Sequence, residues 1–487
     1  MYKILFPVSE AYLLIKTGGL ADIASSLSIA LHAHQCDVRL LLPAYQPVLD
    51  QVKSADIVTE FYVPESDAHI RILETTLPET DVIVWLVDHP ASYLRPGNPY
   101  LDANGEPWPD NAARFALLSR VAAMIGLGNA GISWQPEVVH CHDWQTALAP
   151  ALISLADRRP VTVFTIHNLA YQGLFDASLM DELHLPPEFW CPEGLEFYGQ
   201  LSFIKGGLMY ADHVTTVSPT YAREIQTPEF GCGLENALRL RADRLTGILN
   251  GIDDTVWDPE TDPYLSVTFD RQRYTRKAPN KKALQTEANF RASTKVPVLS
   301  QVCRLVSQKG VDLVIGAIYQ LLEKKVPFQF VSLGNGNPEF EEGLTELATN
   351  YAKQVYSMIG YDEVHAHHIL AGSDMFLVPS RFEPCGLTQM YSLRYGAIPI
   401  VRNVGGLADT VVDANEVNLQ AGRATGFVFE DATVEALVAA IERAMQMYED
   451  RETWSRLVAN AMAQDFSWRT SVDQYMHLYR SLIGMRT

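Results

Sequence analysis

Residues 2–42 read YKILFPVSEAYLLIKTGGLADIASSLSIALHAHQCDVRLLL and combine two strand patterns with one helical pattern. The runs at 2–8 and 37–42 are short and apolar, as buried strands are. Between them, apolar residues recur on one helical face: Leu20, Ile23, Ala24, Leu27 and Leu31. A strand, a helix and a second strand in this order are typical of a parallel α/β sheet.

The same alternation continues along most of the chain. Strands are expected at 82–87, 137–140, 161–166 and 213–217, and in a second series at 297–302, 328–333, 374–378 and 398–401. The polar segment 253–280 is expected to be a loop, and 437–448 and 454–462 are expected to be helices. The pattern predicts an α/β fold class with parallel sheets.

Length and composition indicate two domains. The chain has 487 residues, of which 47% are hydrophobic, and a single core seldom grows beyond roughly 250–300 residues. We place the boundary near residue 245, because the second series begins near Gly247-Ile248-Leu249-Asn250-Gly251. The expected organisation is a domain at 1–245, a domain at 246–465 and a C-terminal segment at 466–487.

Charge and cysteine usage exclude several classes of function. The net charge of −20 argues against nucleic acid or an anionic membrane as partner, because both favour a basic face. The chain opens directly into an apolar strand and no stretch approaches about 18 consecutive apolar residues, so we expect a soluble cytoplasmic protein. The scattered cysteines predict free thiols and no zinc site: Cys36, Cys141, Cys191, Cys232, Cys303 and Cys385.

One motif points directly to chemistry: Pro379-Ser380-Arg381-Phe382-Glu383-Pro384-Cys385-Gly386-Leu387-Thr388-Gln389. Glu383 stands just before a run that has the pattern of a helix start. Its carboxylate can accept hydrogen bonds from sugar hydroxyls, and the free N–H groups of a helix N-terminus favour a phosphate. Together they predict a nucleotide-sugar site.

A second motif, Lys16-Thr17-Gly18-Gly19-Leu20-Ala21-Asp22, lies between a predicted strand and a predicted helix. Paired glycines let backbone amides approach an anion, and the lysine adds a full charge. The spacing matches neither a Walker A loop nor a dinucleotide fingerprint. A tight turn with an exposed lysine is the alternative, and the segment alone does not decide between the two.

Two predicted strands end in polar side chains, at His140-Cys141-His142-Asp143-Trp144 and at Thr165-Ile166-His167-Asn168. In a parallel sheet such positions face the crevice where ligands bind. A single histidine there is more often a structural hydrogen-bonding residue. The recurrence of His, Asp and Asn at two successive strand ends favours a site.

Arg304 and Lys309 lie between a predicted strand and a predicted helix. Near the helix start at Gly386 they would supply two cations for a diphosphate, the arginine as a bidentate fork and the lysine as a point charge. A solvated loop is the alternative reading of these two residues.

Three further features are interpreted mainly as structural. Gly334-Asn335-Gly336-Asn337 lacks the third glycine of a dinucleotide loop and predicts an ordinary tight turn. The histidines at 365, 367 and 368 are interpreted as packing residues, so no metal is expected. The turn Gly405-Gly406-Leu407-Ala408-Asp409 could close over a sugar or merely connect two elements.

The ordered motifs resemble one family, the bacterial glycogen synthases and plant starch synthases, which extend α-1,4-glucans from ADP-glucose. The resemblance also includes residues 165–173 and Leu249-Asn250-Gly251-Ile252-Asp253, and it covers nearly the whole chain. It implies the GT-B fold, two Rossmann-like domains facing across a deep cleft, with a C-terminal segment that packs back on the first domain. Lys16 and Glu383 would then meet across that cleft.

The resemblance also implies site roles. Glu383 would hold glucose hydroxyls, His167 would lie close to the anomeric carbon, and Arg304 and Lys309 would bind the ADP phosphates. The implied substrate-binding residues are Lys16, Gly18, Gly19, Asp22, Asp143, Asn168, Asn250, Tyr361, Cys385, Gly386, Leu387 and Thr388. Among these, Tyr361 would stack on adenine and Asn250 would contact the donor near its phosphates. No metal and no cofactor are implied.

Two positions depart from the wider pattern of retaining GT-B enzymes. Many of them carry a second glutamate eight positions after the first, and here that position is Tyr391. A carboxylate contact to the ribose therefore cannot be assumed. Cys303 replaces the more usual serine before Arg304, which is expected to alter packing only.

The predicted reaction is transfer of glucose from ADP-glucose to the 4-hydroxyl at the non-reducing end of an α-1,4-glucan such as glycogen, with retention of configuration. The choice of ADP-glucose over UDP-glucose rests on the resemblance. One alternative is a glucan phosphorylase, which shares the fold but needs a lysine bound to pyridoxal phosphate. A catalytically silent glucan or nucleotide binder is the other, although it would need fewer of the groups at Lys16, His167, Arg304, Lys309 and Glu383.

Overall fold

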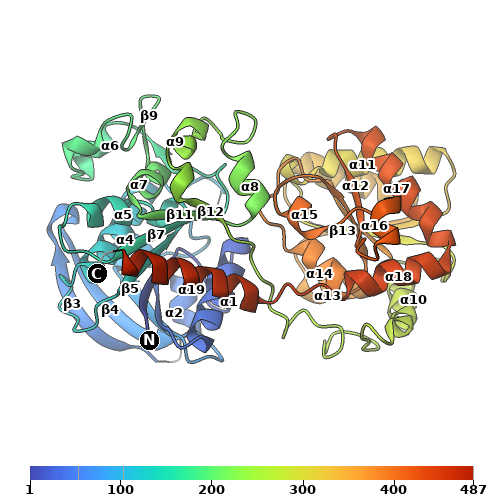
Figure 1. Ribbon diagram of the computed structural model, residues 1–487, viewed down its shortest axis with the longest axis horizontal. Coiled ribbons are helices and arrows are strands. Elements are labelled where there is room, and N and C mark those ends of the chain that lie inside the picture. Colours follow the sequence, from blue (N-terminus) through green and yellow to red (C-terminus); the bar gives the residue numbers. More distant parts are fainter. Residues whose placement is uncertain (53, 103, 486–487) are drawn as a thin grey trace. The chain divides into compact units, whose positions relative to one another are not determined.

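The computed structural model describes residues 1–52, 54–102 and 104–485. The chain forms two compact units, the first made of residues 1–251 with the segment from Trp468 onward, and the second of Ile252–Ser467. Each unit has a parallel sheet flanked by helices (Figure 1). The division lies between Gly251 and Ile252 instead of near residue 245. The reason is that strand β12 (Leu245–Gly247) pairs with β11 (His213–Thr216) and so belongs to the first unit.

Within the described residues, unit 1 contains a nine-stranded sheet in the order β12-β11-β7-β6-β1-β2-β5-β4-β3. Its other strands are β1 (Lys3–Pro7), β2 (Asp37–Pro43), β3 (Asp56–Val63), β4 (Ala68–Thr76), β5 (Ile83–Asp88), β6 (Val138–His142) and β7 (Val161–Ile166). The strands from β12 to β5 run parallel, as the sequence predicts. Strands β3 and β4 were not predicted. They add an antiparallel edge, in which β3 is exposed or half-buried along nearly all of its length.

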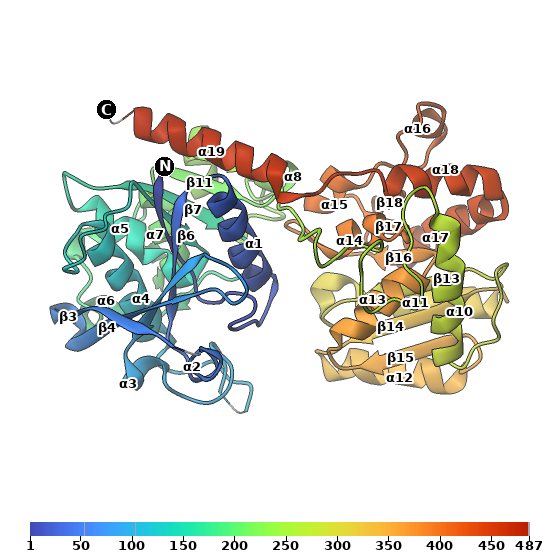
Figure 2. The same cartoon turned by 90° about the horizontal axis from the view of Figure 1, so that it is seen from below.

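Helix α1 (Gly19–Ala33) confirms the predicted helical face, since Leu20, Ile23, Ala24, Leu27 and Leu31 are all buried. The C-terminal helix α19 (Trp468–Gly484) packs on α1, and the two lie side by side in Figure 1 and Figure 2. The other helices of unit 1 are α2 (Gln46–Gln51), α3 (Pro90–Tyr93), α4 (Asn111–Gly126), α5 (Leu148–Ser154), α6 (Leu179–Glu182), α7 (Phe203–Tyr210), α8 (Pro219–Glu224) and α9 (Glu235–Leu240).

A small antiparallel sheet in unit 1 was also missed by the sequence analysis. It consists of β8 (Leu174–Phe175), β9 (Glu196–Phe197) and β10 (Gln200–Ser202), with β10 in the middle. The ring of Phe175 contacts Trp144 and Phe203, which attaches this sheet to the segment after β6. Such short strands carry too few residues to show a periodic pattern.

Unit 2 contains a six-stranded parallel sheet in the order β15-β14-β13-β16-β17-β18 among its described residues. The strands are β13 (Val298–Val302), β14 (Gln329–Gly334), β15 (Val355–Ile359), β16 (Met375–Val378), β17 (Ile398–Arg402) and β18 (Phe427–Phe429). The helices are α10 (Ala278–Glu287), α11 (Val311–Glu323), α12 (Pro338–Asn350), α13 (Glu363–Gly372), α14 (Thr388–Arg394), α15 (Gly405–Thr410), α16 (Glu416–Gln420), α17 (Val434–Glu449) and α18 (Arg451–Ala461). The order reverses beside β13, so ligands are expected at the carboxyl ends of β13 and β16.

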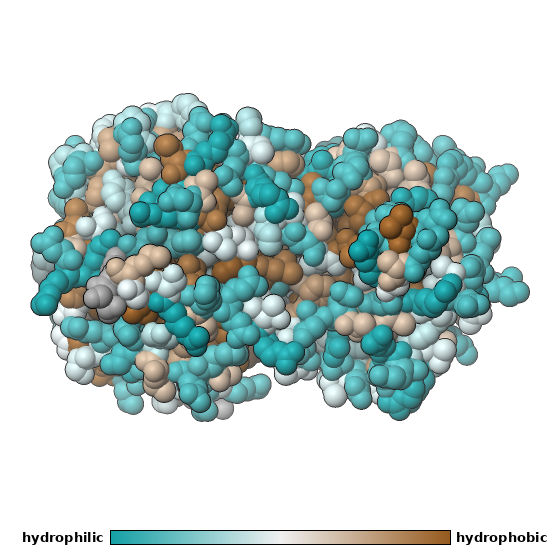
Figure 3. Space-filling view, viewed as in Figure 1, coloured by the Kyte–Doolittle hydropathy of each residue, from teal (hydrophilic) through white to brown (hydrophobic). Residues whose placement is uncertain are grey.

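The surface agrees with the composition. Hydrophilic residues predominate on the face shown in Figure 3, as expected from the net charge of −20. Among the helices of the described residues, none combines the length and hydropathy that a bilayer crossing requires.

Candidate active site

In unit 2 the candidate residues follow the carboxyl ends of adjacent strands. Arg304 and Lys309 come after β13, Glu383 comes after its neighbour β16, and Tyr361 comes after the edge strand β15. Because neighbouring strands lie about 4.8 Å apart, loops that follow β13 and β16 can touch. The sequence predicted that Arg304 and Lys309 follow a strand, whereas Tyr361 was assigned by resemblance alone. The sheet order explains why Lys309 and Glu383, far apart in sequence, come together.

Lys309 and Glu383 form an ion pair between these two loops. The Lys309 Nζ donates to Glu383 Oε2 at 2.5 Å, and the hydroxyl of Ser380 donates to the same oxygen at 2.9 Å. The side chain of Glu383 is only 6% exposed and that of Lys309 is 21% exposed. A buried carboxylate needs such partners to stay charged, so the pair stabilises both groups in place.

Arg381 fastens the two loops to each other. Its guanidinium forms a fork on Asp312 of α11, with distances of 2.7 and 2.6 Å, and also donates to the carbonyl of Ser307 at 2.8 Å. The amide side chain of Gln308 donates to the carbonyl of Phe382 at 3.2 Å. These contacts hold the backbone on both sides of the Lys309–Glu383 pair.

The segment Cys385–Thr388 forms a tight turn that leads into α14. Gly386 has φ of 72°, a left-handed conformation that other residues adopt at a cost. The side-chain Nε2 of Gln389 donates to the carbonyls of Cys385 and Gly386 and so closes the turn. Leu387 precedes Thr388, the first residue of α14. The turn therefore stands directly after Glu383, as the sequence predicts.

Gly406 explains the second glycine turn of unit 2, for which the sequence left two interpretations. A Cβ at Gly406 would lie 2.0 Å from the carbonyl oxygen of Cys385, and its N–H donates to the carbonyl of Glu383 at 3.0 Å. The glycine thus allows α15 to approach the Glu383 loop closely. It supports the loop, which is a role the sequence analysis did not assign.

Arg304 and Tyr361 are exposed. Arg304 projects from the loop after β13, and the ring of Tyr361 is 72% exposed, with its hydroxyl donating to Glu363 at 2.9 Å. Burial raises the pKa of the neighbouring Cys303 to about 12, so this thiol stays protonated. Tyr391, at the position of the missing second glutamate, stacks on Trp257 with ring centroids 4.1 Å apart.

In unit 1 the candidate residues follow β6 and β7. Asp143 directly follows β6 and has φ of 53° and ψ of −178°, a conformation that is almost restricted to glycine. Its Oδ1 accepts from the backbone N–H of His167 at 2.8 Å and from that of Asn168 at 3.4 Å. Burial raises the pKa of Asp143 to about 7. A strained backbone at such a position is a sign of function, and Asp143 fixes the turn that carries His167 and Asn168.

His167 is paired with a second histidine. Its Nε2 lies 2.9 Å from Nδ1 of His142, the last residue of β6. Burial lowers the pKa of His167 to about 3 and that of His142 well below the usual value, so both rings are neutral at pH 7. His142 stood in a quoted motif, but the sequence analysis gave it no role.

The glycine loop differs in part from the expected phosphate cradle. The N–H groups of Thr17 and Gly18 donate to Glu10 Oε2 at 2.5 and 3.1 Å, so in this structure these amides bind a carboxylate of the chain itself. Lys16 donates to Asp22 at 2.9 Å. A Cβ added to Gly18 or Gly19 would meet no atom within 4 Å, so both glycines border open space.

Glu10 is a residue that the sequence analysis missed. Its other oxygen accepts from the hydroxyl of Tyr100 at 2.9 Å, and burial raises its pKa. It follows β1 closely, so the rule that selected Asp143 and His167, a polar side chain just beyond a strand end, would have found it.

Asn250 lies in unit 1, whereas the sequence analysis placed it in the second domain. The residue is 4% exposed, and its Oδ1 has no hydrogen-bond partner in the part of the chain that the structure describes. Next to it, the carbonyl of Leu249 accepts from Ser471, and Gly251 packs on Trp468 of α19. The C-terminal helix therefore supports the segment that carries Asn250.

The three clustered histidines of unit 2 differ in their surroundings. His367 is fully buried and contacts Asp262 at 2.7 Å. His365 and His368 both approach Glu287, a carboxylate that the sequence analysis did not place beside them. No group of three or more His, Cys, Asp or Glu side chains suited to a metal occurs among the described residues.

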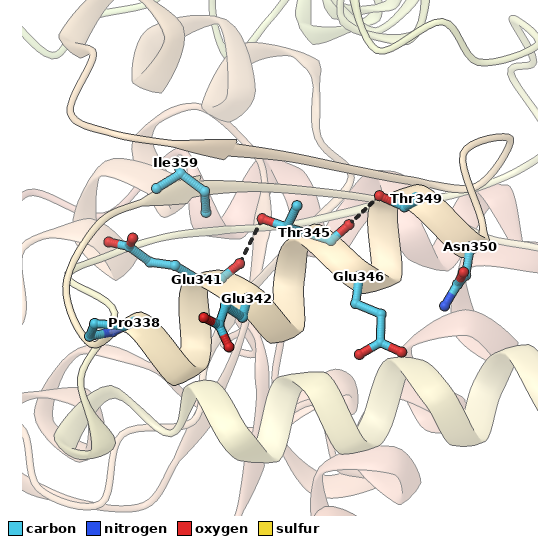
Figure 4. A pocket seen from close by; sticks show the side chains of 8 residues that line it. All are labelled: Pro338, Glu341, Glu342, Thr345, Glu346, Thr349, Asn350 and Ile359. Carbon is cyan, nitrogen blue, oxygen red and sulfur yellow. Dashed lines mark hydrogen bonds between the residues drawn. The ribbon is translucent and has the colours of Figure 1, made fainter.

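An open groove in unit 2 is separate from these residues. Its lining includes Glu341, Glu342 and Glu346 on α12 and Ile359 at the end of β15 (Figure 4). Figure 4 also shows that Thr345 and Thr349 bond to the backbone of their own helix. The carboxylates would repel a phosphate, so this groove does not fit a nucleotide.

Two family models match the chain, one in each unit. Residues 3–240 match the family described as the starch synthase catalytic domain, and residues 285–460 match the glycosyl transferases group 1 family. The two matches fall on unit 1 and unit 2 respectively.

Similar proteins match over their full length. "Glycogen synthase 1" of Methylococcus capsulatus is 52% identical over 99% of this chain and 97% of its own. "Glycogen synthase 2" of Nitrosococcus oceani is 50% identical over 99% and 98%. The catalytic domain of starch synthase IV from Arabidopsis thaliana, solved with ADP and acarbose bound, superposes with a TM-score of 0.89 at 34% identity, covering 99% of each chain.

Proposed function

We propose a donor and an acceptor on the premise that the chain belongs to the family of bacterial glycogen synthases and plant starch synthases. The donor is ADP-glucose and the acceptor is glycogen. The protein is a glycosyltransferase with the GT-B fold. Glucose would pass to the 4-hydroxyl at the non-reducing end of an α-1,4-glucan, with retention of configuration. The related starch synthase IV structure contains ADP, which supports adenine as the donor base.

The Lys309–Glu383 pair is the observation that carries this proposal. A cation and a carboxylate touch at 2.5 Å beside the turn Cys385–Thr388. A nucleotide sugar presents the complementary groups, a diphosphate joined directly to a ring bearing hydroxyls. Lys309 would bind the diphosphate together with Arg304, and Glu383 would accept hydrogen bonds from glucose hydroxyls.

The backbone of Cys385, Gly386, Leu387 and Thr388 would donate to the same phosphates, because amides at a helix start favour an anion. The exposed ring of Tyr361 would stack on adenine. Asn250, with its orphaned Oδ1, is suited to contact the donor.

Unit 1 would supply neutral groups and one further cation. His167 would lie near the anomeric carbon, with Asp143 holding its backbone and Asn168 beside it. Lys16 would bind the donor, with Asp22 orienting its ammonium group. Gly18 and Gly19 border open space and would let a substrate approach the backbone closely.

Charge develops in two places as the glycosidic bond breaks, positive on the sugar ring and negative on the departing diphosphate. Lys309, Arg304 and Lys16 would stabilise the anion, and preorganised groups of this kind often supply the largest catalytic contribution. We propose attack from the same face through an ion pair, in which a phosphate oxygen of the leaving group accepts the proton of the 4-hydroxyl. Trapping a glycosyl adduct on an Asp or Glu side chain would contradict this mechanism.

Two experiments test the proposal. Incubating the protein with labelled ADP-glucose and glycogen should place label in the polymer, and α-amylase should release it. Mixing ADP-glucose and UDP-glucose at equal concentration should show preferential use of the ADP sugar. No transfer from either nucleotide sugar would contradict the function, and equal use of the two would contradict only the donor assignment.

Because charged nucleotide sugars do not cross bilayers unaided, we also place the reaction in the cytoplasm.

A further inference from the structure

The histidine pair at the end of β6 and β7 is unusual in its surroundings. His142 is fully buried, and its ring stacks on Phe6 with centroids 4.0 Å apart. Its second neighbour is His140, at 4.2 Å between centroids. Nδ1 of His142 faces Nε2 of His167 at 2.9 Å. His142 thus presents one ring nitrogen to His167 from a rigid, apolar wall.

His140 is held on both sides and keeps this wall in place. Its Nε2 lies 2.6 Å from the hydroxyl of Thr165 on β7, and its Nδ1 lies 2.8 Å from the hydroxyl of Tyr479 on α19. Burial lowers the pKa of His140 to about 3. The neighbour of His142 is therefore a neutral ring with both nitrogens engaged.

Two neutral imidazoles that face each other share one hydrogen in their contact. Either His142 donates from Nδ1 to His167, or His167 donates from Nε2 to His142. The first arrangement requires the hydrogen of His142 to be on Nδ1, and the second requires it to be on Nε2. The surroundings of His142 Nε2 therefore decide between them.

Nε2 of His142 is buried and has no hydrogen-bond partner among the residues that the structure describes. A hydrogen placed there would be a buried N–H donor with no acceptor, whereas an unprotonated Nε2 would only leave one acceptor unused. Buried donors without a partner are the rarer of the two in proteins. The hydrogen of His142 therefore belongs on Nδ1, from which it is donated to His167.

We propose that His142 is a positioning residue that holds His167 as the Nδ1–H tautomer. Nε2 of His167 is then an occupied acceptor, and its Nδ1–H is the group left to meet a ligand. No hydrogen bond from His167 Nδ1 occurs within the described parts of the chain, and the side chain is half-buried. His167 meets the bound nucleotide sugar as a hydrogen-bond donor to an oxygen.

This inference rests on the proposed function, which brings His167 to the substrate, and it sharpens the mechanism. A histidine with a hydrogen on Nδ1 and an engaged Nε2 has no free lone pair. It cannot accept the proton of the acceptor hydroxyl. That proton must go elsewhere, which agrees with its transfer to a phosphate oxygen of the leaving group.

The first test is spectroscopic and uses the whole, unmodified chain. With 15N-labelled histidine, the ring nitrogens of His167 should give a protonated-type shift for Nδ1 and an unprotonated-type shift for Nε2 at about pH 7.5. The signals are assigned by their loss in the His167→Gln variant, and the measurement is repeated with ADP. A protonated Nε2 on His167 would overturn the proposal.

A matched pair of variants supplies the second test. His142→Asn keeps an N–H near the position of Nδ1, whereas His142→Leu fills the same apolar space without a donor. The Leu variant should shift His167 toward the Nε2–H form and lower kcat about 10- to 100-fold, a range typical of lost supporting hydrogen bonds. The donor KM should change less than threefold, and the Asn variant should recover most of kcat.

The outcomes separate the inference from the function. Equal loss of kcat in both variants, or an unchanged His167 tautomer in the Leu variant, would overturn the positioning role. If the Leu variant fails to fold, the spectrum of the unmodified chain and the Asn variant still decide. If the unmodified chain transfers no sugar, the proposed function fails, while the 15N shifts still report the tautomer.

Discussion

The two units solve the same problem, a polar site at the end of a parallel sheet, in different ways. The strand ends of unit 2 carry opposite charges in contact, Lys309 with Glu383 and Arg381 with Asp312. The strand ends of unit 1 carry groups whose charge is suppressed by burial, His142, His167 and Asp143. A charged pair is suited to exchange partners with a charged ligand, whereas neutral rings are suited to fixed hydrogen bonds.

The comparison therefore predicts that charge matters most in unit 2 and that tautomer and geometry matter most in unit 1. Variants that remove a charge without changing shape should be severe in unit 2 and mild in unit 1.

Glu383→Gln should have the largest effect. The amide cannot compensate positive charge on Lys309 or on the sugar ring, so kcat should fall about 100- to 1,000-fold, as expected for a lost preorganised group. ADP affinity should fall only modestly, because the phosphate-binding groups remain. Steady-state kinetics with ADP-glucose and calorimetry with ADP measure the two effects.

Glu342→Gln is the matched control for this prediction. Glu342 lies in the acidic groove on α12. Its replacement by Gln removes the same charge at a position away from the Lys309–Glu383 pair. Its kcat should stay within twofold of the unmodified chain. A Glu383→Gln variant that is no worse than this control would show that the charged pair has no part in the reaction.

Asp143→Asn should have a smaller effect on turnover. The amide oxygen can still accept from the N–H of His167, so kcat should fall about tenfold or less, within the energy of one weakened hydrogen bond. Asp143→Ala removes the acceptor and keeps a strained backbone, and its kcat should be at least a further tenfold lower. Equal, severe losses in both variants would show that the negative charge is essential and that unit 1 resembles unit 2.

The same residue predicts a dependence of stability on pH. Because the pKa of Asp143 is raised to about 7, the folded protein binds its proton more tightly than the unfolded chain does. This stabilisation is complete below about pH 4 and is lost as the pH rises through about 7. The free energy of unfolding is measured with urea at about pH 5 and at about pH 8. Its decrease between these two pH values should be about 1–3 kcal/mol smaller in Asp143→Asn than in the unmodified chain.

The sequence predicted most of the parallel strands, α1 and the strand-end residues, because each depends on local periodicity or on the position where a strand ends. It missed the parallel strands β15 and β18, which lie at the two edges of the sheet in unit 2. It also did not predict β3 and β4 at the edge of the sheet in unit 1. β3 is exposed or half-buried along nearly all of its length, and β4 alternates between buried and exposed residues only over 68–72. The structure divides the chain after Gly251 instead of near residue 245, because the short strand β12 completes the first sheet, a pairing that no local pattern shows.

Within the site, the sequence identified the residue types better than their connections. Gly406 is needed because a carbonyl lies 2.0 Å from where its Cβ would be, which only packing reveals. Glu10 binds two amides of the glycine loop, so an acid of the chain takes contacts that the motif alone assigned to an anion. The assignments of the site residues to substrate groups remain predictions.

Arg381→Lys tests how far unit 2 depends on a fixed geometry around its charges. A lysine keeps the charge but cannot form the two-pronged contact with Asp312 and also reach the carbonyl of Ser307. The loops carrying Lys309 and Glu383 should loosen, and kcat/KM for ADP-glucose should fall about tenfold. Asp312→Asn weakens the same contact from the other side and should lower kcat/KM by a similar factor. The loss in the double variant should be smaller than the sum of the two single losses in free energy. Additive losses would show that the two residues act separately.

Tyr479→Phe should have the smallest effect and shows whether α19 only supports unit 1. The change removes the hydroxyl that meets Nδ1 of His140 at 2.8 Å, in a fully buried position. The free energy of unfolding should fall by about 0.5–1.5 kcal/mol, the usual net worth of one hydrogen bond. Because His142 and His167 keep their own contact, kcat should stay within twofold, and the 15N shifts of His167 should not change. Tyr448→Phe in unit 2, also a tyrosine with buried hydrogen bonds, is the control for stability alone. A tenfold loss of kcat in Tyr479→Phe would mean that α19 acts on the reaction through His140. The neutral histidines of unit 1, His140, His142 and His167, would then be as sensitive to substitution as the charged pair of unit 2.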